Sequence, residues 1–253
     1  MTTQHLTIIT GASRGVGAAL VAELIAPGQT LLGLARHANA DLQARADAAG
    51  VALTQWSVDL VEPLPIAERL RAWLIAQNPA TLASVTLINN AGVTGTLAPA
   101  AQVPLAELSR SLRVGLEATL LLSAVFLDAT AGWAMPRKLM NVSSGLGRFA
   151  MAGSAVYCAA KAGMDNFSRA LALEQAGLAH PAQIESVAPG VIVTDMQAAL
   201  RAADPALFPE RARFVAMQQS GQLISPAVCA QRLLARLARP DFGAQTLTDI
   251  REG

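Results

Sequence analysis

A tyrosine and a lysine stand four residues apart in Tyr157-Cys158-Ala159-Ala160-Lys161, and Tyr157 is the only tyrosine in the chain. Residues at this spacing share one face of a helix. A phenol with an ordinary pKa of ~10 is a poor acid at neutral pH, but a neighbouring ammonium group stabilises the phenolate and lowers that pKa. The pair could therefore give a proton to a reacting oxygen atom. Because such pairs also occur on ordinary helix surfaces, the spacing alone is weak evidence.

A hydroxyl group precedes this pair in the segment Asn141-Val142-Ser143-Ser144-Gly145, which ends a predicted strand. In α/β folds, ligands bind at the carboxyl ends of parallel strands. Ser144 could donate a hydrogen bond to a carbonyl oxygen and stabilise the charge that develops there. The alternative is an ordinary serine at a strand end.

A glycine-rich loop, Gly11-Ala12-Ser13-Arg14-Gly15-Val16-Gly17, lies between a predicted strand and a predicted helix. Gly11 allows a tight turn, Gly15 lets the backbone approach a pyrophosphate, and Gly17 lets the helix pack close to the strand. The helix N-terminus offers free N–H groups and partial positive charge to the phosphates. The loop therefore predicts a dinucleotide site that includes Ser13, Arg14 and Val16, with an ordinary glycine-rich turn as the alternative.

The choice of dinucleotide is read at the end of the second predicted strand, Leu34-Ala35-Arg36-His37, which has no carboxylate. A carboxylate there would bind the ribose 2′-hydroxyl of NAD, whereas an arginine suits the 2′-phosphate of NADP. Arg14, in the glycine-rich loop, could join Arg36 on that phosphate. The two arginines predict NADP(H), although either could be a solvated surface charge.

The elements that must position these residues alternate between strand and helix along the chain. The predicted strands cover Leu6–Thr10, Thr30–Ala35, Val51–Val58, Val85–Asn89, Lys138–Val142, Gln183–Val187 and Gln245–Ile250, and the predicted helices cover Val16–Ala26, Asp41–Ala49, Ile66–Gln77, Leu105–Ala129, Ala155–Leu178 and Val228–Leu237. This alternation predicts an α/β fold: a single-domain, Rossmann-type, doubly wound parallel sheet of about seven strands with helices on both faces.

No linker divides residues 1–253, so we expect one domain whose first half binds the nucleotide. The irregular part is Thr194–Gly221, which contains Pro205, Pro209 and many charges. It reads as a substrate-binding insertion of two short helices that could move over a cleft.

Composition limits the function classes. Apolar residues make up 53% of the chain and charged residues 15%, which is enough for a large core and argues against disorder. A net charge of +1 gives no electrostatic footprint for nucleic acid or an anionic membrane. Cys158 and Cys229 have no CxxC partner, so we expect no metal site and a reducing compartment. The N-terminal segment Met1–His5 carries no secretion signal, and we expect a cytoplasmic protein.

Together these motifs resemble the short-chain dehydrogenase/reductase family. The matching features, in the family's order and spacing, are Thr10–Gly17, Asp59-Leu60, Asn89-Asn90-Ala91-Gly92, Ser144, Tyr157 with Lys161, and Pro189-Gly190. The resemblance implies that Tyr157 is the general acid in reduction and the base in oxidation. It implies further that Lys161 tunes Tyr157 and binds the nicotinamide ribose, while Ser144 orients the carbonyl group. Homodimers or homotetramers formed through the long helices are also implied.

The resemblance also places the cofactor along the sheet edge. It implies that Asp59 and Leu60 lie at the adenine, that Asn89, Ala91 and Gly92 line the middle of the cofactor, and that Pro189, Gly190, Val191, Val193 and Thr194 hold the nicotinamide end. Hydride would come from the nicotinamide and the proton from Tyr157, with the protein supplying the geometry.

One position departs from the family pattern, in Val114-Gly115-Leu116-Glu117. The family usually has an asparagine where Gly115 stands, and that residue supports a water-linked proton relay from the lysine. Gly115 keeps the main-chain carbonyl but loses the amide side chain. We expect a reduced or re-routed relay rather than an inactive enzyme.

Segments late in the chain resemble sepiapterin reductases and bacterial benzil reductases, namely Val187–Gln197, Gly221–Pro226 and Thr248–Arg251. In sepiapterin reductases an aspartate near the last strand anchors the pterin, and Asp249 falls at a comparable place. Diketone or aromatic ketone reduction is equally compatible, and Asp249 could instead be structural. An apolar pocket is expected, for which Leu146, Phe149, Met151, Met196 and Trp133 are candidates, although each could simply be core.

The sequence therefore predicts an NADPH-dependent oxidoreductase that reduces a ketone or diketone to an alcohol. The alternative is a catalytically weak NADP(H)-binding or sensing protein on the same fold, for which Gly115 is the support. A Rossmann-like methyltransferase is disfavoured because it would need an acidic residue where Arg36 stands.

Overall fold

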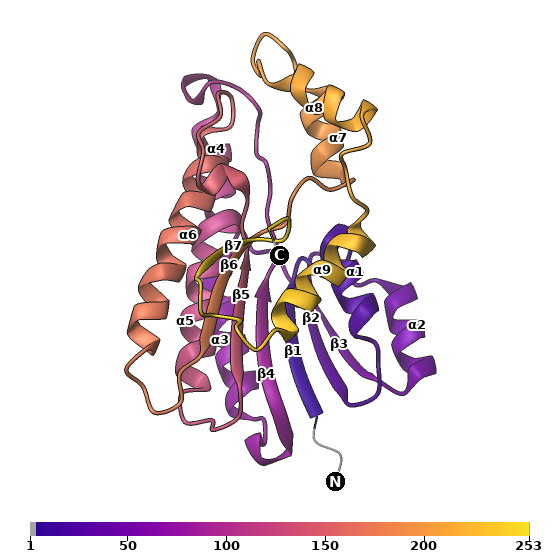
Figure 1. Ribbon diagram of the computed structural model, residues 1–253, viewed down its shortest axis with the longest axis vertical. Coiled ribbons are helices and arrows are strands. Elements are labelled where there is room, and N and C mark those ends of the chain that lie inside the picture. Colours follow the sequence, from indigo (N-terminus) through magenta and orange to yellow (C-terminus); the bar gives the residue numbers. More distant parts are fainter. Residues whose placement is uncertain (1–3, 253) are drawn as a thin grey trace.

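Seven parallel strands form one sheet in the order β3-β2-β1-β4-β5-β6-β7 (Figure 1). The computed structural model describes residues 4–252; Gly253 and Met1–Thr3, the start of the segment on which the expected localisation depends, lie outside the described residues. The strands are β1 (Gln4–Thr10), β2 (Gln29–Ala35), β3 (Ala52–Ser57), β4 (Leu82–Asn89), β5 (Arg137–Val142), β6 (Gln183–Ala188) and β7 (Leu247–Asp249).

The strand order reverses at β1, because the chain adds β2 and β3 on one side and then returns to add β4 on the other. The loops that follow β1 and β4 therefore leave the sheet in opposite directions and open a crevice between them. In doubly wound sheets this is where ligands bind.

Helices cover both faces of the sheet, which confirms the predicted fold (Figure 1). The helices are α1 (Gly15–Leu24), α2 (Ala40–Ala49), α3 (Pro63–Ile75), α4 (Leu105–Leu112), α5 (Ala118–Ala129), α6 (Ala155–Gln175), α7 (Asp195–Ala202), α8 (Arg211–Gln219) and α9 (Pro226–Ala238). Helices α1, α2 and α9 lie on one face, and α3, α5 and α6 lie on the other.

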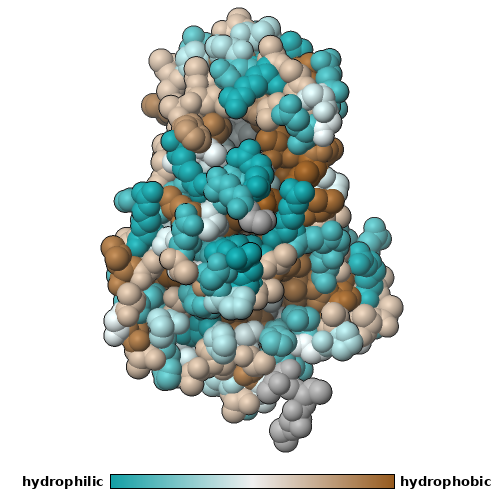
Figure 2. Space-filling view, viewed as in Figure 1, coloured by the Kyte–Doolittle hydropathy of each residue, from teal (hydrophilic) through white to brown (hydrophobic). Residues whose placement is uncertain are grey.

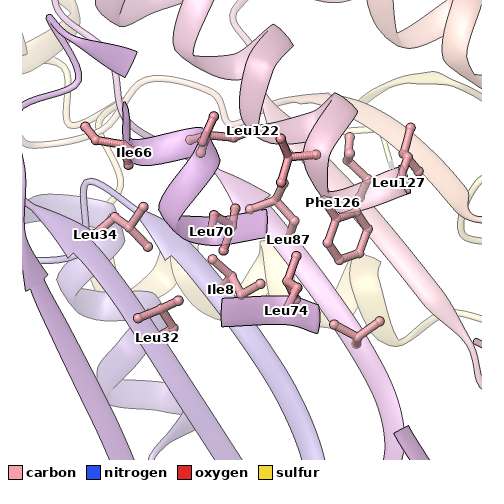
Figure 3. Close-up of a cluster of buried hydrophobic side chains, with 14 of the residues drawn as sticks. Ile8, Leu32, Leu34, Ile66, Leu70, Leu74, Leu87, Leu122, Phe126 and Leu127 are labelled. Atoms are coloured by element: carbon pink, nitrogen blue, oxygen red, sulfur yellow. The ribbon is translucent and has the colours of Figure 1, made fainter. Parts of the chain in front are cut away.

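Two apolar cores result, one on each face of the sheet. On the α3–α5–α6 face, Ile8 and Leu87 of the sheet pack against Leu70 of α3 and Phe126 of α5, all fully buried (Figure 3). On the other face, Ile9 and its neighbours pack against α1, α2 and α9. The central strands β1, β2 and β4 are near-continuous buried runs, as expected for a parallel sheet covered on both faces, whereas the edge strand β3 has only two buried residues.

The segment predicted as one long helix, Leu105–Ala129, is interrupted by a π-helical turn, Arg113–Glu117, between α4 and α5. Gly115 is buried at the centre of this turn, and a Cβ atom there would lie 3.3 Å from the Cβ atom of Ala160 on α6. The absence of a side chain lets the bulged turn approach α6 closely. Such turns are frequent at functional sites.

Helices α7 and α8 stand above the carboxyl edge of the sheet, at the top of the molecule in Figure 1. They occupy the segment in which the sequence predicts two short helices. Across residues 4–252, no helix has both the length and the apolar character needed to cross a membrane.

Candidate active site

The glycine-rich loop leaves β1 in a conformation that needs its glycines. Gly11 and Gly15 have φ values of +69° and +56°, a region that L side chains rarely adopt. A Cβ atom on Gly17 would lie only 2.1 Å from the carbonyl oxygen of Gly11, so any side chain there would collide with backbone. Gly11 therefore forms the predicted tight turn and Gly17 the predicted close approach, while the approach of Gly15 to a pyrophosphate stays a prediction.

The N-terminus of α1 is open for an anionic ligand. Arg14 occupies the N-cap position without a capping side-chain hydrogen bond, and the first turn of α1 contains no acidic residue. Unpaired N–H groups at a helix N-terminus are a ready anion site. Ser13 is half-buried at this turn and Val16 packs into the core. The loop thus fits the pyrophosphate of a dinucleotide.

Two exposed residues flank the expected adenosine end. Arg36 follows β2 and is exposed, and Asp59 follows β3. The Asp59 carboxylate accepts a hydrogen bond from the backbone N–H of Val61 at 3.1 Å, which shapes the turn, while Leu60 is buried. Both side chains lie at the carboxyl edge, where the resemblance places them.

Arg14 is paired with an acidic residue in this structure. Its guanidinium pairs with the carboxylate of Asp195 on α7 at 2.5 Å, and both side chains are largely exposed. An exposed ion pair contributes only ~0–1 kcal/mol. The pair joins the glycine-rich loop to the start of the α7–α8 segment. Because breaking it costs little free energy, Arg14 can turn toward a phosphate.

The loop after β4 is fixed to the end of β1 by Asn90. The backbone N–H groups of Asn90 and Ala91 both donate to the Thr10 hydroxyl at 3.0 Å, and the Asn90 amide donates to the Thr10 carbonyl at 2.9 Å. Asn90 was not among the predicted site residues, although it lies inside the Asn89–Gly92 motif. Its role is to hold Ala91 and Gly92 at the crevice.

The Asn89 side chain does not line the crevice, contrary to the expectation from the resemblance. It is buried and donates to Ser123 on α5 at 3.0 Å and to Asn141 on β5 at 2.9 Å. Asn141 continues the chain of hydrogen bonds to Ser168 on α6 at 2.8 Å. Through its amide nitrogen Asn89 therefore links β4 to α5 and β5 behind the site, while its Oδ1 atom has no hydrogen-bond partner among the described residues.

Tyr157 and Lys161 lie on the first two turns of α6, which begins at Ala155. Lys161 is buried, and its ammonium group donates to the carbonyl of Val142 at the end of β5 at 2.7 Å. The same nitrogen lies 5.8 Å from the centre of the Tyr157 ring. The helix and the β5 edge thus hold the two groups together at the carboxyl end of the sheet.

Burial dominates the proton affinities of this pair. Burial raises the pKa of Tyr157 above its ordinary value, against the opposing effect of a hydrogen bond with Ser144. Burial also lowers the pKa of Lys161 to about 8, against the opposing negative charge of Asp165. The net pKa of Tyr157 is therefore raised rather than lowered, contrary to the expectation, because burial has the largest effect on it. Tyr157 keeps its proton at neutral pH.

Ser144 lies near Tyr157 on a different element, the turn after β5. It is the N-cap of the short turn Gly145–Gly147 after β5, and its hydroxyl accepts a hydrogen bond from the backbone N–H of Leu146 at 3.1 Å. Ser144 and Tyr157 both line one cavity of about 580 Å³. The structure therefore brings the hydroxyl group and the phenol to the same ligand space.

This cavity is largely apolar. Four of the five candidate lining residues do line it, Leu146, Phe149, Met151 and Met196, whereas Trp133 is buried in the core on the α3–α5 side. Phe214 and Met217 of α8 complete the wall and were not predicted, because helical spacing does not show which face meets a ligand. Figure 2 shows apolar side chains gathered beneath the lobe formed by α7 and α8.

The segment after β6 forms the floor between the cavity and the glycine-rich loop. Pro189, Gly190, Val191 and Thr194 all line the cavity. A Cβ atom on Gly15 would meet the Thr194 methyl group at 3.8 Å, so this segment borders the nucleotide loop. Val193 is exposed, and its backbone N–H donates to Ile224 at 2.9 Å. Val193 is therefore the member of the predicted set that faces solvent.

Asp249 is not presented to the cavity. Its side chain is only 4% exposed and is held in a two-point ion pair by Arg251, with contacts of 2.8 Å and 2.5 Å. Arg251 itself lines the cavity. The carboxylate expected to anchor a pterin thus already has a guanidinium partner from its own chain.

The fold and this site together define a class of oxidoreductases that use a nicotinamide dinucleotide. Residues 5–205 match the family model described as short chain dehydrogenase. The chain belongs to the short-chain dehydrogenase family. Its relatives include benzil reductases and sepiapterin reductases, the subgroup that the sequence predicts.

Two relatives align over nearly the whole chain. A benzil reductase ((S)-benzoin forming) of Bacillus subtilis (strain 168) is 32% identical over 248 residues, which cover 98% of this chain and 99% of that protein. A sepiapterin reductase of Meriones unguiculatus is 31% identical, with coverage of 96% and 95%. A solved structure from Beutenbergia cavernae, described as an NAD(P) dependent gluconate 5-dehydrogenase with bound NADP at low occupancy, has a TM-score of 0.80 and 26% identity, and the match covers 98% of this chain and 95% of that one.

Proposed function

We propose that this chain is an NADPH-dependent carbonyl reductase that converts a ketone or diketone to an alcohol. The observation that carries the proposal is the convergence of Ser144 and Tyr157 on one apolar cavity, with Lys161 buried behind Tyr157. The nicotinamide supplies the hydride when it is bound. The protein's own part is to hold the carbonyl oxygen and to deliver the proton.

The two hydroxyl groups divide this work. Ser144 donates a hydrogen bond to the carbonyl oxygen and stabilises the negative charge that grows on it during reduction. Tyr157, which is protonated at neutral pH, transfers its proton to the same oxygen. Lys161 stabilises the phenolate that remains. Phe214 and Met217 of α8 place apolar side chains beside this step.

NADP(H) is favoured over NAD(H) by charge. Arg36 is exposed at the end of β2, and Arg14 is held only by an exposed ion pair. Guanidinium groups bind phosphates through charge-assisted hydrogen bonds. The relative from Beutenbergia cavernae was solved with NADP, which supports the same choice.

An aromatic diketone suits the cavity better than a pterin does. The wall offers Leu146, Phe149 and Met196 to apolar rings. A pterin would need a buried carboxylate for its amino-pyrimidine edge, and Asp249 is already paired with Arg251. The substrate named for the benzil reductase relative is therefore the better guide to this chain.

The test is loss of NADPH absorbance in the presence of benzil, sepiapterin or simple aryl ketones. We expect kcat/KM for benzil to exceed that for sepiapterin by roughly fivefold to 150-fold, because one unpaired polar anchor is worth ~1–3 kcal/mol. A preference for sepiapterin would contradict the diketone assignment. Tight NADPH binding with no turnover on any carbonyl compound would favour the alternative, a catalytically weak NADP(H)-binding or sensing protein.

The missing amide at Gly115 gives a second test. Gly115→Asn is expected to raise kcat by about threefold to tenfold over Gly115→Ala, because the amide adds to the relay carbonyl that glycine already supplies. Gly115→Ala is the matched control for packing. The added methyl group of Gly115→Ala would lie 3.3 Å from the Cβ atom of Ala160, which is a tight contact. Replacing a helical glycine by alanine stabilises the helix and offsets that contact, so the free energy of unfolding should change by less than ~1 kcal/mol. Equal kcat values for the two variants would show that the amide plays no part.

We also propose a homo-oligomer, a homodimer or homotetramer, formed through the long helices. Leu105 on α4 and Leu173 on α6 are 82% and 79% exposed. A second copy packed against either helix would remove its exposed apolar side chain from water.

A further inference from the structure

Asp165 is a buried carboxylate on the helix that carries the reactive pair. It lies one turn beyond Lys161, as Lys161 lies one turn beyond Tyr157, so the three side chains share one face of α6. The Asp165 side chain is only 4% exposed. A buried charge is costly unless the surrounding groups compensate for it, so its partners show what it does.

One oxygen of Asp165 joins α6 to β6. Its Oδ1 atom accepts a hydrogen bond from the hydroxyl of Ser186 at 2.6 Å. Ser186 lies on β6, three residues before the Pro189-Gly190 segment that lines the cavity. The carboxylate thus fixes the strand that leads into the nicotinamide end of the site.

The other oxygen faces the turn that carries Ser144. A Cβ atom on Gly147 would lie 2.6 Å from the Oδ2 atom of Asp165 and 3.0 Å from the carbonyl of Lys161, so the turn Gly145–Gly147 sits directly on this part of α6. Oδ2 has no hydrogen-bond partner among residues 4–252, and the nearest cation, Arg148 Nε, is 3.7 Å away. The carboxyl group therefore leaves one oxygen without a hydrogen-bond donor at the junction of the turn and the helix.

The charged groups around this junction are few. Lys161 lies on the same helix, Arg148 on the turn after β5, and the Asp249–Arg251 pair beyond Arg148. The negative charge of Asp165 opposes the effect of burial on Lys161, whose pKa is about 8. Arg148, a second cation, also interacts with the Asp165 carboxylate, at 3.7 Å.

We propose that Asp165 is a positioning residue for the reaction, which holds the Ser144 turn against α6 and supplies the negative charge that keeps Lys161 an ammonium group. The inference rests on the proposed reductase function. It extends the catalytic arrangement by a third turn of α6, from Tyr157 through Lys161 to Asp165.

The decisive experiment compares pH profiles of kcat for the wild type, Asp165→Asn and Ser186→Ala. Asp165→Asn keeps the shape and can still accept the Ser186 hydrogen bond, but it removes the charge. Loss of a negative charge lowers the pKa of Lys161, so the alkaline fall in kcat should move to lower pH by about one unit. Ser186→Ala keeps the carboxylate, so its alkaline fall should stay within a few tenths of the wild-type value. An alkaline fall that does not move in a folded Asp165→Asn variant would overturn the proposal.

Arg148→Gln provides a second measurement if Asp165→Asn fails to fold. Removing this cation strengthens the net negative field at Lys161, so the alkaline fall should move to higher pH, opposite to the effect of Asp165→Asn. A shift to lower pH, or none, would overturn the inference. A wild type without turnover would instead mean that the proposed function fails.

If the wild type has no turnover, the Lys161 side chain is titrated by NMR, with Lys161→Ala to assign its signal. Equal Lys161 pKa values in the wild type and Asp165→Asn would reject the role of Asp165.

Discussion

Tyr157→Phe is expected to lower kcat for carbonyl reduction by about 10²- to 10⁴-fold, the usual contribution of a positioned general acid. The phenyl ring fills the same space, so the fold and the cavity should persist. The lost group is the hydroxyl that lines the cavity beside Ser144. The affinity for NADPH should change little, because the glycine-rich loop and Arg36 carry the phosphate contacts that we propose.

Stopped-flow and steady-state NADPH oxidation with benzil would measure the loss, and NADPH fluorescence titration would measure affinity. The matched control is Cys158→Ala, on the same turn of α6. Cys158 is a free, half-buried thiol outside the cavity wall, so its removal should leave kcat within about twofold. Comparable turnover in Tyr157→Phe and wild type would remove Tyr157 from the mechanism and with it the single observation on which the proposed function rests.

The alternation of apolar runs and helical spacing was enough to predict the fold. Each strand that the structure contains overlaps a predicted one, and the order follows from right-handed crossovers in a doubly wound sheet. The glycine spacing likewise predicted a tight turn at Gly11 and a close approach at Gly17, since only a missing Cβ fits 2.1 Å from a carbonyl oxygen. These features depend on local sequence, which the chain displays directly.

Features that depend on side-chain direction could not be predicted in the same way. The π turn at Gly115 adds one residue to a helix without disturbing its apolar pattern. Asn89 turns into the core because Ser123 and Asn141, distant in sequence, offer it partners. Asp249 is the last residue of β7, and the chain that follows brings Arg251 back to its carboxylate. Asp165 belongs to no motif. Its position four residues after Lys161 does not reveal that the turn at Gly147 packs against its side chain.

Arg36→Asp is expected to reverse the preference of the enzyme between NADPH and NADH. The change removes one charge-assisted contact to the 2′-phosphate, worth about 1.5–3 kcal/mol, and places a carboxylate where the phosphate must bind. We therefore expect kcat/KM for NADPH to fall by about 10²-fold or more, while the new carboxylate can accept hydrogen bonds from the ribose hydroxyls of NADH. The measured quantity is the ratio of kcat/KM values for the two cofactors with one carbonyl substrate.

Two variants separate a local effect from a general one. Arg45→Asp makes the same change of charge on the exposed surface of α2, where the Arg45 guanidinium donates a hydrogen bond to the carbonyl of Ala22, and it should leave the ratio unchanged. Arg14→Met asks whether the second arginine leaves Asp195 for the phosphate: the exposed ion pair is weak enough that a bound 2′-phosphate can displace it. If Arg14→Met lowers the NADPH preference by about tenfold, both arginines bind the phosphate. If Arg36→Asp leaves the ratio unaltered, the end of β2 does not select the cofactor, and the assignment of NADP(H) loses its basis in this chain.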